Sequence, residues 1–150
     1  MTTSSQDLSN LCSKLHIHLN GIYCKDQLRG KSFNDGGYIL NLDNSTNKGT
    51  HWTACWVENN QCVYFDAFGI IYCDELLNWS KDKVIYYNCK QIQHITDLHC
   101  GYFCLFFLYF FQYQQQSNKM ELFNNLFSSN TKANLKLLRK YFKQLIKINI

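Results

Sequence analysis

Four residues in the middle of the chain have side chains that together could carry out nucleophilic catalysis: His51, Asp66, Gln93 and Cys100. A thiol attacks a carbonyl as its thiolate, so it needs a base such as imidazole beside it. The base in turn needs an acid that fixes its tautomer and stabilises the imidazolium. The oxyanion that forms needs hydrogen-bond donors aimed at it. These four residue types supply each of these groups, and the sequence predicts that they share one site.

Cys100 is the candidate nucleophile because of its local sequence. It follows the polar turn of residues 96–99 and precedes an apolar stretch, which predicts a buried helix over residues 101–113. A helix N-terminus carries partial positive charge and free amide donors, both of which favour a thiolate. Gly101 is expected to leave the backbone open where a peptide must approach the thiol. The backbone amide of Cys100 and the side-chain amide of Gln93, seven residues earlier, are the candidate oxyanion donors.

A predicted hairpin brings His51 and Asp66 together. Residues 50–57 and 62–68 are rich in aromatic and β-branched side chains, and Asn59-Asn60 between them suits a two-residue turn. With that turn, Thr53 faces Asp66, and His51 lies on the same side of the sheet as Thr53. The backbones of His51 and Asp66 are then about 7–8 Å apart, within reach of an imidazole and a carboxylate. A register slip of one residue would separate them.

The rest of the pattern predicts a single α+β domain over residues 1–150, with a small, mainly antiparallel sheet packed against helices. No repeat, linker or composition break divides the chain. A hydrophobic fraction of 46% and a charged fraction of 17% suit one sizeable core. Beyond the hairpin and the helix of residues 101–113, we expect helices over residues 4–15, 74–79, 119–127 and 132–148, strands over 38–42 and 84–92, and loops over 30–37 and 43–49.

The eight cysteines are interpreted as free thiols in a reducing compartment, because the polar start of the chain shows no secretory signal. No C-x-x-C pair occurs, and the spacing of Cys12, His16, His18 and Cys24 fits no familiar zinc pattern, so we expect no metal site. The most apolar stretch, residues 100–111, is too short to span a bilayer, and we expect no membrane partner.

Residues near the four candidates have alternative interpretations. His99 adjoins Cys100 and competes with His51 as the base, but a residue one position away usually points elsewhere. Asp97 is expected to cap the helix that carries Cys100. Trp52 is expected to shield the histidine by packing, Cys104 to be a core residue, and His94 to face solvent.

The net charge is +4, and much of the positive excess lies on the predicted last helix. Between its apolar positions stand Lys132, Lys136, Arg139, Lys140, Lys143 and Lys147. The simpler interpretation is the solvated face of an amphipathic helix. The second is a stripe that binds DNA, which predicts affinity that falls steeply with added salt.

Three segments carry a resemblance to a known family. Residues 49–56 read GTHWTACW, residues 62–69 read CVYFDAFG, and Gln93 stands seven residues before CGYFC at residues 100–104. Their order and spacing resemble the adenovirus maturation protease family (adenain), whose relatives occur in virophages and in Maverick/Polinton elements. Residues 4–8 and 19–23 are similar to the family's opening helix and its following loop. The resemblance covers roughly the first three quarters of the chain.

The resemblance implies a papain-like, adenain-like cysteine protease fold with the nucleophile at a helix N-terminus. It assigns His51 as the base, Asp66 as its orienting acid, Cys100 as the nucleophile, and Gln93 with the Cys100 amide as the oxyanion hole. The adenovirus enzyme has glutamate where this chain has Asp66; aspartate fills the role in the related SUMO-specific proteases. No cofactor is required. Cys89 does not match the spacing of the cysteine that tethers the family's activating peptide, so a DNA or peptide activator is left open.

The implied function is that of a viral cysteine endopeptidase that cleaves capsid or other virion precursor proteins during maturation, typically after glycine. It implies action in the virion or in the virus factory of the host cell, in the cytoplasm or nucleus, and no secretion. Two alternatives stand beside it: a cysteine protease specific for ubiquitin-like modifiers, and an inactive DNA-binding or structural virion protein.

Overall fold

A mixed five-stranded sheet forms the centre of the computed structural model, which describes residues 3–81 and 83–150. The strands stand in chain order across the sheet. The three inner strands are antiparallel, as expected, whereas each outer strand runs parallel to its neighbour. A parallel pair needs a crossover connection instead of a tight turn, and the long connections 25–35 and 66–83 supply it. The strands are β1 Leu19–Cys24, β2 Gly36–Asn41, β3 Trp52–Glu58, β4 Gln61–Phe65 and β5 Val84–Tyr87.

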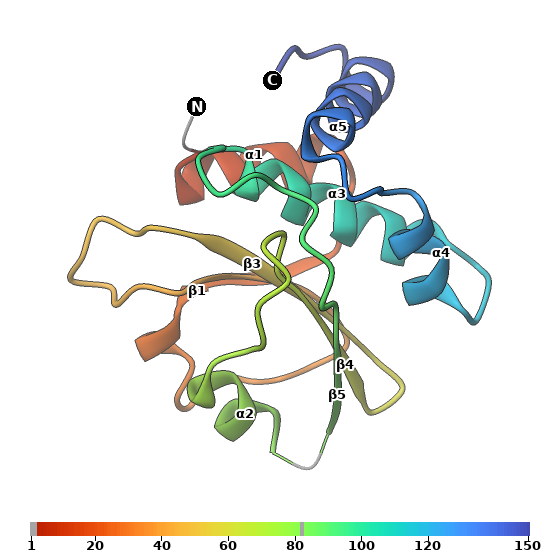
Figure 1. The fold of residues 1–150 in the computed structure, drawn as a ribbon. Helices are drawn as coiled ribbons and strands as arrows, with labels where there is room; N and C mark the ends of the chain where they lie inside the picture. Colours follow the sequence, from red (N-terminus) through yellow and green to blue (C-terminus); the bar gives the residue numbers. More distant parts are fainter. Residues whose placement is uncertain (1–2, 82) are drawn as a thin grey trace.

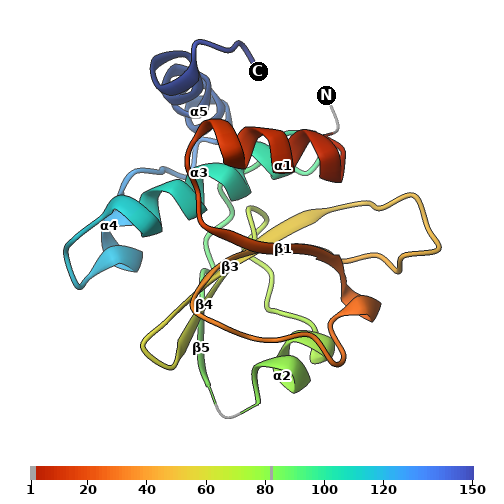
Figure 2. The ribbon, with the colours of Figure 1, turned by 180° about the vertical axis from the view of Figure 1, so that it is seen from behind.

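Helices cover the two faces of the sheet unequally. Figures 1 and 2 show α1, α3 and α5 on one side of the sheet and the short α2 on the other. The helices are α1 Ser5–Lys14, α2 Asp74–Ser80, α3 Cys100–Tyr113, α4 Lys119–Asn125 and α5 Thr131–Ile146, with a 3-10 turn η1 at Lys25–Gln27. The predicted α+β class is confirmed, and each predicted helix is present within a few residues of its expected ends.

Local chemistry explains the best-predicted elements. Ser4 caps α1 in a capping box with Asp7, which satisfies two free amide groups of the first turn. Asn59 and Asn60 have positive φ values of 50° and 63°, as a two-residue hairpin turn of this type requires. The predicted hairpin register is confirmed, with Val57 opposite Cys62 and the pairing continuing to Ala54 and Phe65.

Two strands differ from the expectation. Residues 19–23, expected as a loop, lie in the edge strand β1; Asn20 and Gly21 interrupt any alternating pattern there, and the register with β2 shifts between Leu19 and Gly21. The strand expected over residues 84–92 ends at Tyr87. At the next residue the side chain of Asn88, and not its main chain, bonds the amide and the carbonyl of Asp66. The main-chain pairing of β5 with β4 therefore ends at Tyr87.

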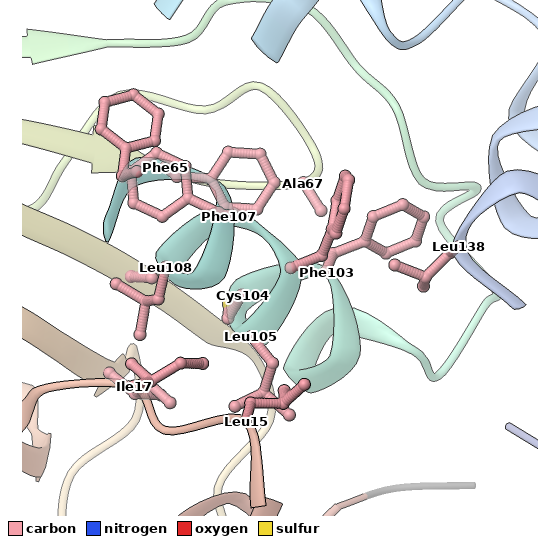
Figure 3. Packing of buried hydrophobic residues seen from close by; sticks show 14 of the residues in the cluster. Leu15, Ile17, Phe65, Ala67, Phe103, Cys104, Leu105, Phe107, Leu108 and Leu138 are labelled. Atoms are coloured by element: carbon pink, nitrogen blue, oxygen red, sulfur yellow. The ribbon is translucent and has the colours of Figure 1, made fainter. Parts of the chain in front are cut away.

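The main core lies between the sheet and α3 (Figure 3). Phe107 of α3 stacks on Phe65 of β4 with ring centroids 4.9 Å apart and planes 10° from parallel. Cys104 is fully buried there, as predicted, and Leu138 of α5 packs from the outer side near Phe103. Burial of large aromatic side chains on both sides of α3 fixes this helix relative to the sheet. The N-terminus of α3 is therefore held firmly at one end of β3 and β4.

Candidate active site

His51 and Asp66 meet at the open end of the hairpin. His51 directly precedes β3 and Asp66 directly follows β4, and the Nε2 atom of His51 lies 2.7 Å from Oδ1 of Asp66. Asp66 is fully buried, and the side chain of His51 is 11% exposed. A carboxylate accepts this bond, so Nε2 is the donor, and Nδ1 is left to interact with another group.

Cys100 is the first residue of α3, and its side chain contributes to the raised pKa of the same imidazole. The thiol-bearing residue is 8% exposed. Burial lowers the pKa of His51, but the hydrogen bond and charge of Asp66, together with the nearby side chain of Cys100, outweigh it and raise that pKa from 6.5 to about 9. Near neutral pH the ring is therefore an imidazolium.

Gln93 lies buried against the turn that leads to Cys100. Its Nε2 atom donates to the carbonyl oxygen of Asp97 at 2.6 Å, and its main-chain amide donates to the carbonyl of Ala67 at 3.0 Å. A side-chain amide carries two N–H donors, so one remains after the bond to Asp97. Gln93 is thus fixed between the segment that follows Asp66 and the segment that precedes Cys100.

Asp97 does not cap α3 as expected. Its Oδ1 atom accepts from the main-chain amide of His99 at 3.1 Å and bonds the ring Nδ1 of the same residue. The N-cap position of α3 is His99, which makes no side-chain capping bond. Asp97 therefore orders the turn ahead of the helix. Asp97 also bonds the ring of His99. The imidazole whose pKa the Cys100 side chain raises is that of His51. His94 is exposed, as expected.

Gly101 has a different role from the expected one. A Cβ atom at this position would overlap Oγ1 of Thr3 and would lie 2.9 Å from Cδ2 of Leu8. The missing side chain therefore makes room for the N-terminal segment of the chain, not for a substrate. Thr3 in turn accepts a hydrogen bond through its carbonyl from Nε1 of Trp52, at 2.9 Å. Trp52 packs partly buried against the main core, as predicted, and this hydrogen bond fixes its indole.

A groove of about 760 Å³ reaches Cys100. One wall is the N-terminal segment of residues 3–5, and the second is Ile22 to Cys24 of β1. The third is formed by Ser45, residues 47–50 and Trp52. Asn41, buried below, anchors the third wall by accepting hydrogen bonds from the amides of Asp43 and Thr50. A second depression, of about 860 Å³, lies between β5, the hairpin turn and residues 115–121, and none of the four candidate residues lines it.

Two residues that sequence reasoning missed contact the site. The ring of Phe68 stacks on the ring of His51, with centroids 4.2 Å apart and planes 12° from parallel. Asn88 is 2% exposed and bonds both main-chain groups of Asp66. Phe68 lies in the segment FDAFG of residues 65–69, in which the sequence predicts a role only for Asp66. Asn88 looks in sequence like an ordinary polar residue at a strand end, and no local signal identifies it.

The structure offers few groups for a metal ion. Across residues 3–81 and 83–150, no three histidine, cysteine or acidic side chains gather as a metal site would require. All eight cysteines are free, and Cys89 is the most exposed of them. In the same described ranges no helix combines the length and apolarity needed to cross a membrane.

Solved structures with the same fold come from a viral protease. A structure of the ASFV pS273R protease matches 95% of this chain with a TM-score of 0.57 and 13% sequence identity. A selenomethionine structure of the same protease matches 75% of the chain with a TM-score of 0.50 and 19% identity. This chain spans only 64% and 44% of the respective solved chains. No family model matches the sequence, and no curated protein matches it as a relative. The likeness shows the fold of that protease, so the activity of the chain depends on its own residues.

Proposed function

We propose that this chain is a viral cysteine endopeptidase with Cys100 as nucleophile, His51 as general base and acid, and Asp66 as the acid that orients His51. One observation carries the proposal. The His51 ring is hydrogen-bonded to the buried carboxylate of Asp66, and the side chain of Cys100, the first residue of α3, raises the pKa of the same ring. The fold shared with the ASFV pS273R protease supports a viral protease activity.

The reaction follows from the positions of these groups. The Cys100 thiolate attacks the scissile carbonyl, and the oxyanion accepts hydrogen bonds from the Cys100 amide and from the free N–H of Gln93. The His51 imidazolium gives its proton to the leaving amine, and the acyl-enzyme is then hydrolysed by a water that His51 deprotonates. Asp66 stays ionised throughout, holding the ring and stabilising its charged form.

The proposed substrates are capsid or other virion precursors, cleaved in the virion or the virus factory. The groove beside Cys100 supports a peptide as the ligand, since its lining combines polar residues such as Ser4, Ser45 and Thr50 with the apolar side chains of Ile22 and Trp52. The test is co-expression with candidate precursor proteins. Trimming that wild type performs and Cys100→Ala does not supports the proposal, and trimming that persists in Cys100→Ala refutes it.

A thiol probe separates this proposal from an inactive structural protein. Iodoacetamide should label Cys100 faster than Cys89, although Cys89 is exposed and Cys100 is buried. The reason is that the thiolate reacts and the thiol does not, and Cys100 stands beside the His51 imidazolium at a helix N-terminus. His51→Ala should abolish the preference, and labelling led by Cys89 in wild type would favour the inactive protein. A ubiquitin-like substrate assayed beside a precursor peptide distinguishes the modifier-specific protease.

DNA binding by α5 is a second proposal, supported by the distribution of its charges. All six basic residues of the predicted stripe are exposed, and Leu138 and Phe142 are buried on the opposite side of the helix. Positions 132, 136, 140, 143 and 147 follow one another along a single helical face. Binding to a DNA duplex should weaken with a log–log salt slope of roughly −3 to −5, since each phosphate contact contributes about −0.9. Affinity that is flat in salt would refute it.

A further inference from the structure

Two segments of irregular chain bring Asp66 and Gln93 into one unit. The segment 66–69 follows β4, and the segment 88–93 follows β5. The carbonyl of Ala67 accepts hydrogen bonds from the amides of Ile92 and Gln93, at 2.9 and 3.0 Å. The acid and the oxyanion donor of the proposed site are therefore joined through their main chains, although 27 positions separate them in sequence.

Asn88 makes the closest connection to the acid itself. Its Oδ1 atom accepts from the amide of Asp66 at 2.9 Å, and its Nδ2 atom donates to the carbonyl of Asp66 at 2.7 Å. The preceding residue, Tyr87, is the last of β5 and pairs with Tyr64 of β4. The side-chain amide thus supplies one acceptor and one donor where a further strand residue would have supplied its main chain. A third bond, from Nδ2 to the carbonyl of Lys90 at 3.2 Å, orients the amide.

The carboxylate of Asp66 depends on this support. Oδ1 accepts from His51 and from the amide of Phe68, at 2.7 and 2.8 Å, whereas the buried Oδ2 has no partner. Among the described residues, His51 is the one side chain that bonds the carboxylate, so its position otherwise depends on the main chain of residues 66–68. Asn88 is buried, and its removal would leave the Asp66 amide unpaired away from water.

We propose that Asn88 is a positioning residue of the active site: by holding both main-chain groups of Asp66, it keeps the carboxylate on His51 and so maintains the imidazolium. The inference rests on the proposed function, since it gives Asn88 a role in the ionisation that cleavage needs. It adds a buried amide to the acid–base pair, and that amide touches neither the substrate nor the reacting atoms.

The test is the titration of His51, followed by the NMR signals of its ring in wild type, Asn88→Ala and Asn88→Ser. The hydrogen bond and charge of Asp66 raise the pKa of His51, so loosening the pair should lower the midpoint by about one unit. The high-pH limb of kcat/KM should move down by the same amount. Serine is too short to bridge both groups of Asp66, so its midpoint should also fall; it serves as the second variant if the alanine form does not fold.

Asn134 offers a matched control. It is also 2% exposed, and its side chain makes three bonds to main chain: with the carbonyls of Ile92 and Ser128 and with the amide of Ser128. Asn134→Ala should lower the melting temperature about as much as Asn88→Ala, yet leave the His51 midpoint within about 0.2 units, because it does not touch Asp66. An unchanged midpoint in Asn88→Ala, or an equal shift in Asn134→Ala, would overturn the proposal.

The positioning role of Asn88 and the proposed protease activity can be refuted separately. The His51 titration needs no substrate, so it reports on Asn88 whether or not a peptide is cleaved. A wild-type chain that cleaves precursors, combined with an unchanged midpoint in the Asn88 variants, refutes the positioning role alone. A shifted midpoint in a chain without Cys100-dependent cleavage refutes the proposed function, and leaves Asn88 as the support of an acid–base pair with another use.

Discussion

The carboxylate of Asp66 is more deeply buried than the other charged group of the candidate site, the His51 ring. It is fully buried, and within the described part of the chain its hydrogen bonds run from the His51 ring and the Phe68 amide to a single oxygen. A buried charge without a counter-ion is strongly unfavourable, so Asp66 favours the protonated form of His51. Residue types and spacing predict His51, Asp66, Gln93 and Cys100 as the residues of the candidate site. They could not select Phe68 or Asn88, whose roles depend on contacts made only in the folded chain.

Gln93 carries the first prediction at this scale. Gln93→Ala should lower kcat on a cleavable peptide by about 10²–10³, the usual loss for one oxyanion donor. His94→Ala is the control in the same segment, because His94 is exposed and its ring bonds only Thr96. Turnover of Gln93→Ala within a few-fold of the control would mean that the amide does not face the oxyanion.

The second prediction at the scale of residues concerns Phe68. Its ring face covers the His51 ring, and an aromatic face stabilises a cation by about 0.5–1 kcal/mol. Phe68→Leu keeps the apolar cover but removes that face, so the pKa of His51 should fall by about half a unit. Phe68→Tyr should leave it in place. Ring NMR titrations of the three proteins decide the matter, and identical midpoints for leucine and phenylalanine would exclude a charge effect of the ring.

At the scale of elements, the hairpin and α3 together create the site. The hairpin was predictable because turn chemistry and side-chain alternation agree on one register. β1 was not, since an edge strand with Asn20 and Gly21 at its centre shows no alternation. β5 ends early because Asn88 turns its side chain into the ladder. The expected cap at Asp97 was wrong because its carboxylate bonds the residue before the helix and not the first turn.

Gly101→Ala tests how closely α3 packs on the N-terminal segment. Alanine usually stabilises a helix relative to glycine by up to about 1 kcal/mol. Here the added methyl group overlaps Thr3 and presses on Leu8, and overpacking of this kind costs about 1–3 kcal/mol. Urea unfolding should therefore show a net loss of stability. The double variant Gly101→Ala/Thr3→Ala should recover part of it, and a stabilised single variant would contradict the packing described.

At the scale of the whole molecule, the ionisation of His51 links the site to stability. The folded-state pKa of about 9 exceeds the unfolded value of 6.5. The folded chain thus binds the proton more tightly, and this contribution is fully present below pH 6.5 and is lost as pH rises through 9. A difference of this size corresponds to about 3 kcal/mol of unfolding free energy.

Urea unfolding at pH 6, 7.5 and 9 in reducing buffer measures this slope. Wild type should lose stability across the series, and His51→Gln should be less stable at pH 6 but nearly flat over the same interval. An equal decline in both proteins would assign the slope to other groups. Thiols such as Cys12, whose pKa burial raises to about 12 in the folded chain, add their own loss only above about pH 9.

The position of Thr3 has a practical consequence for handling the protein. Its side chain fills the space over Gly101, its carbonyl holds the Trp52 indole, and with Ser4 and Ser5 it forms a wall of the groove that ends at Cys100. An affinity tag fused ahead of this residue would start within reach of the nucleophile and compete with added peptides as a tethered ligand. A tag ahead of Thr3 is therefore better removed before kinetic work.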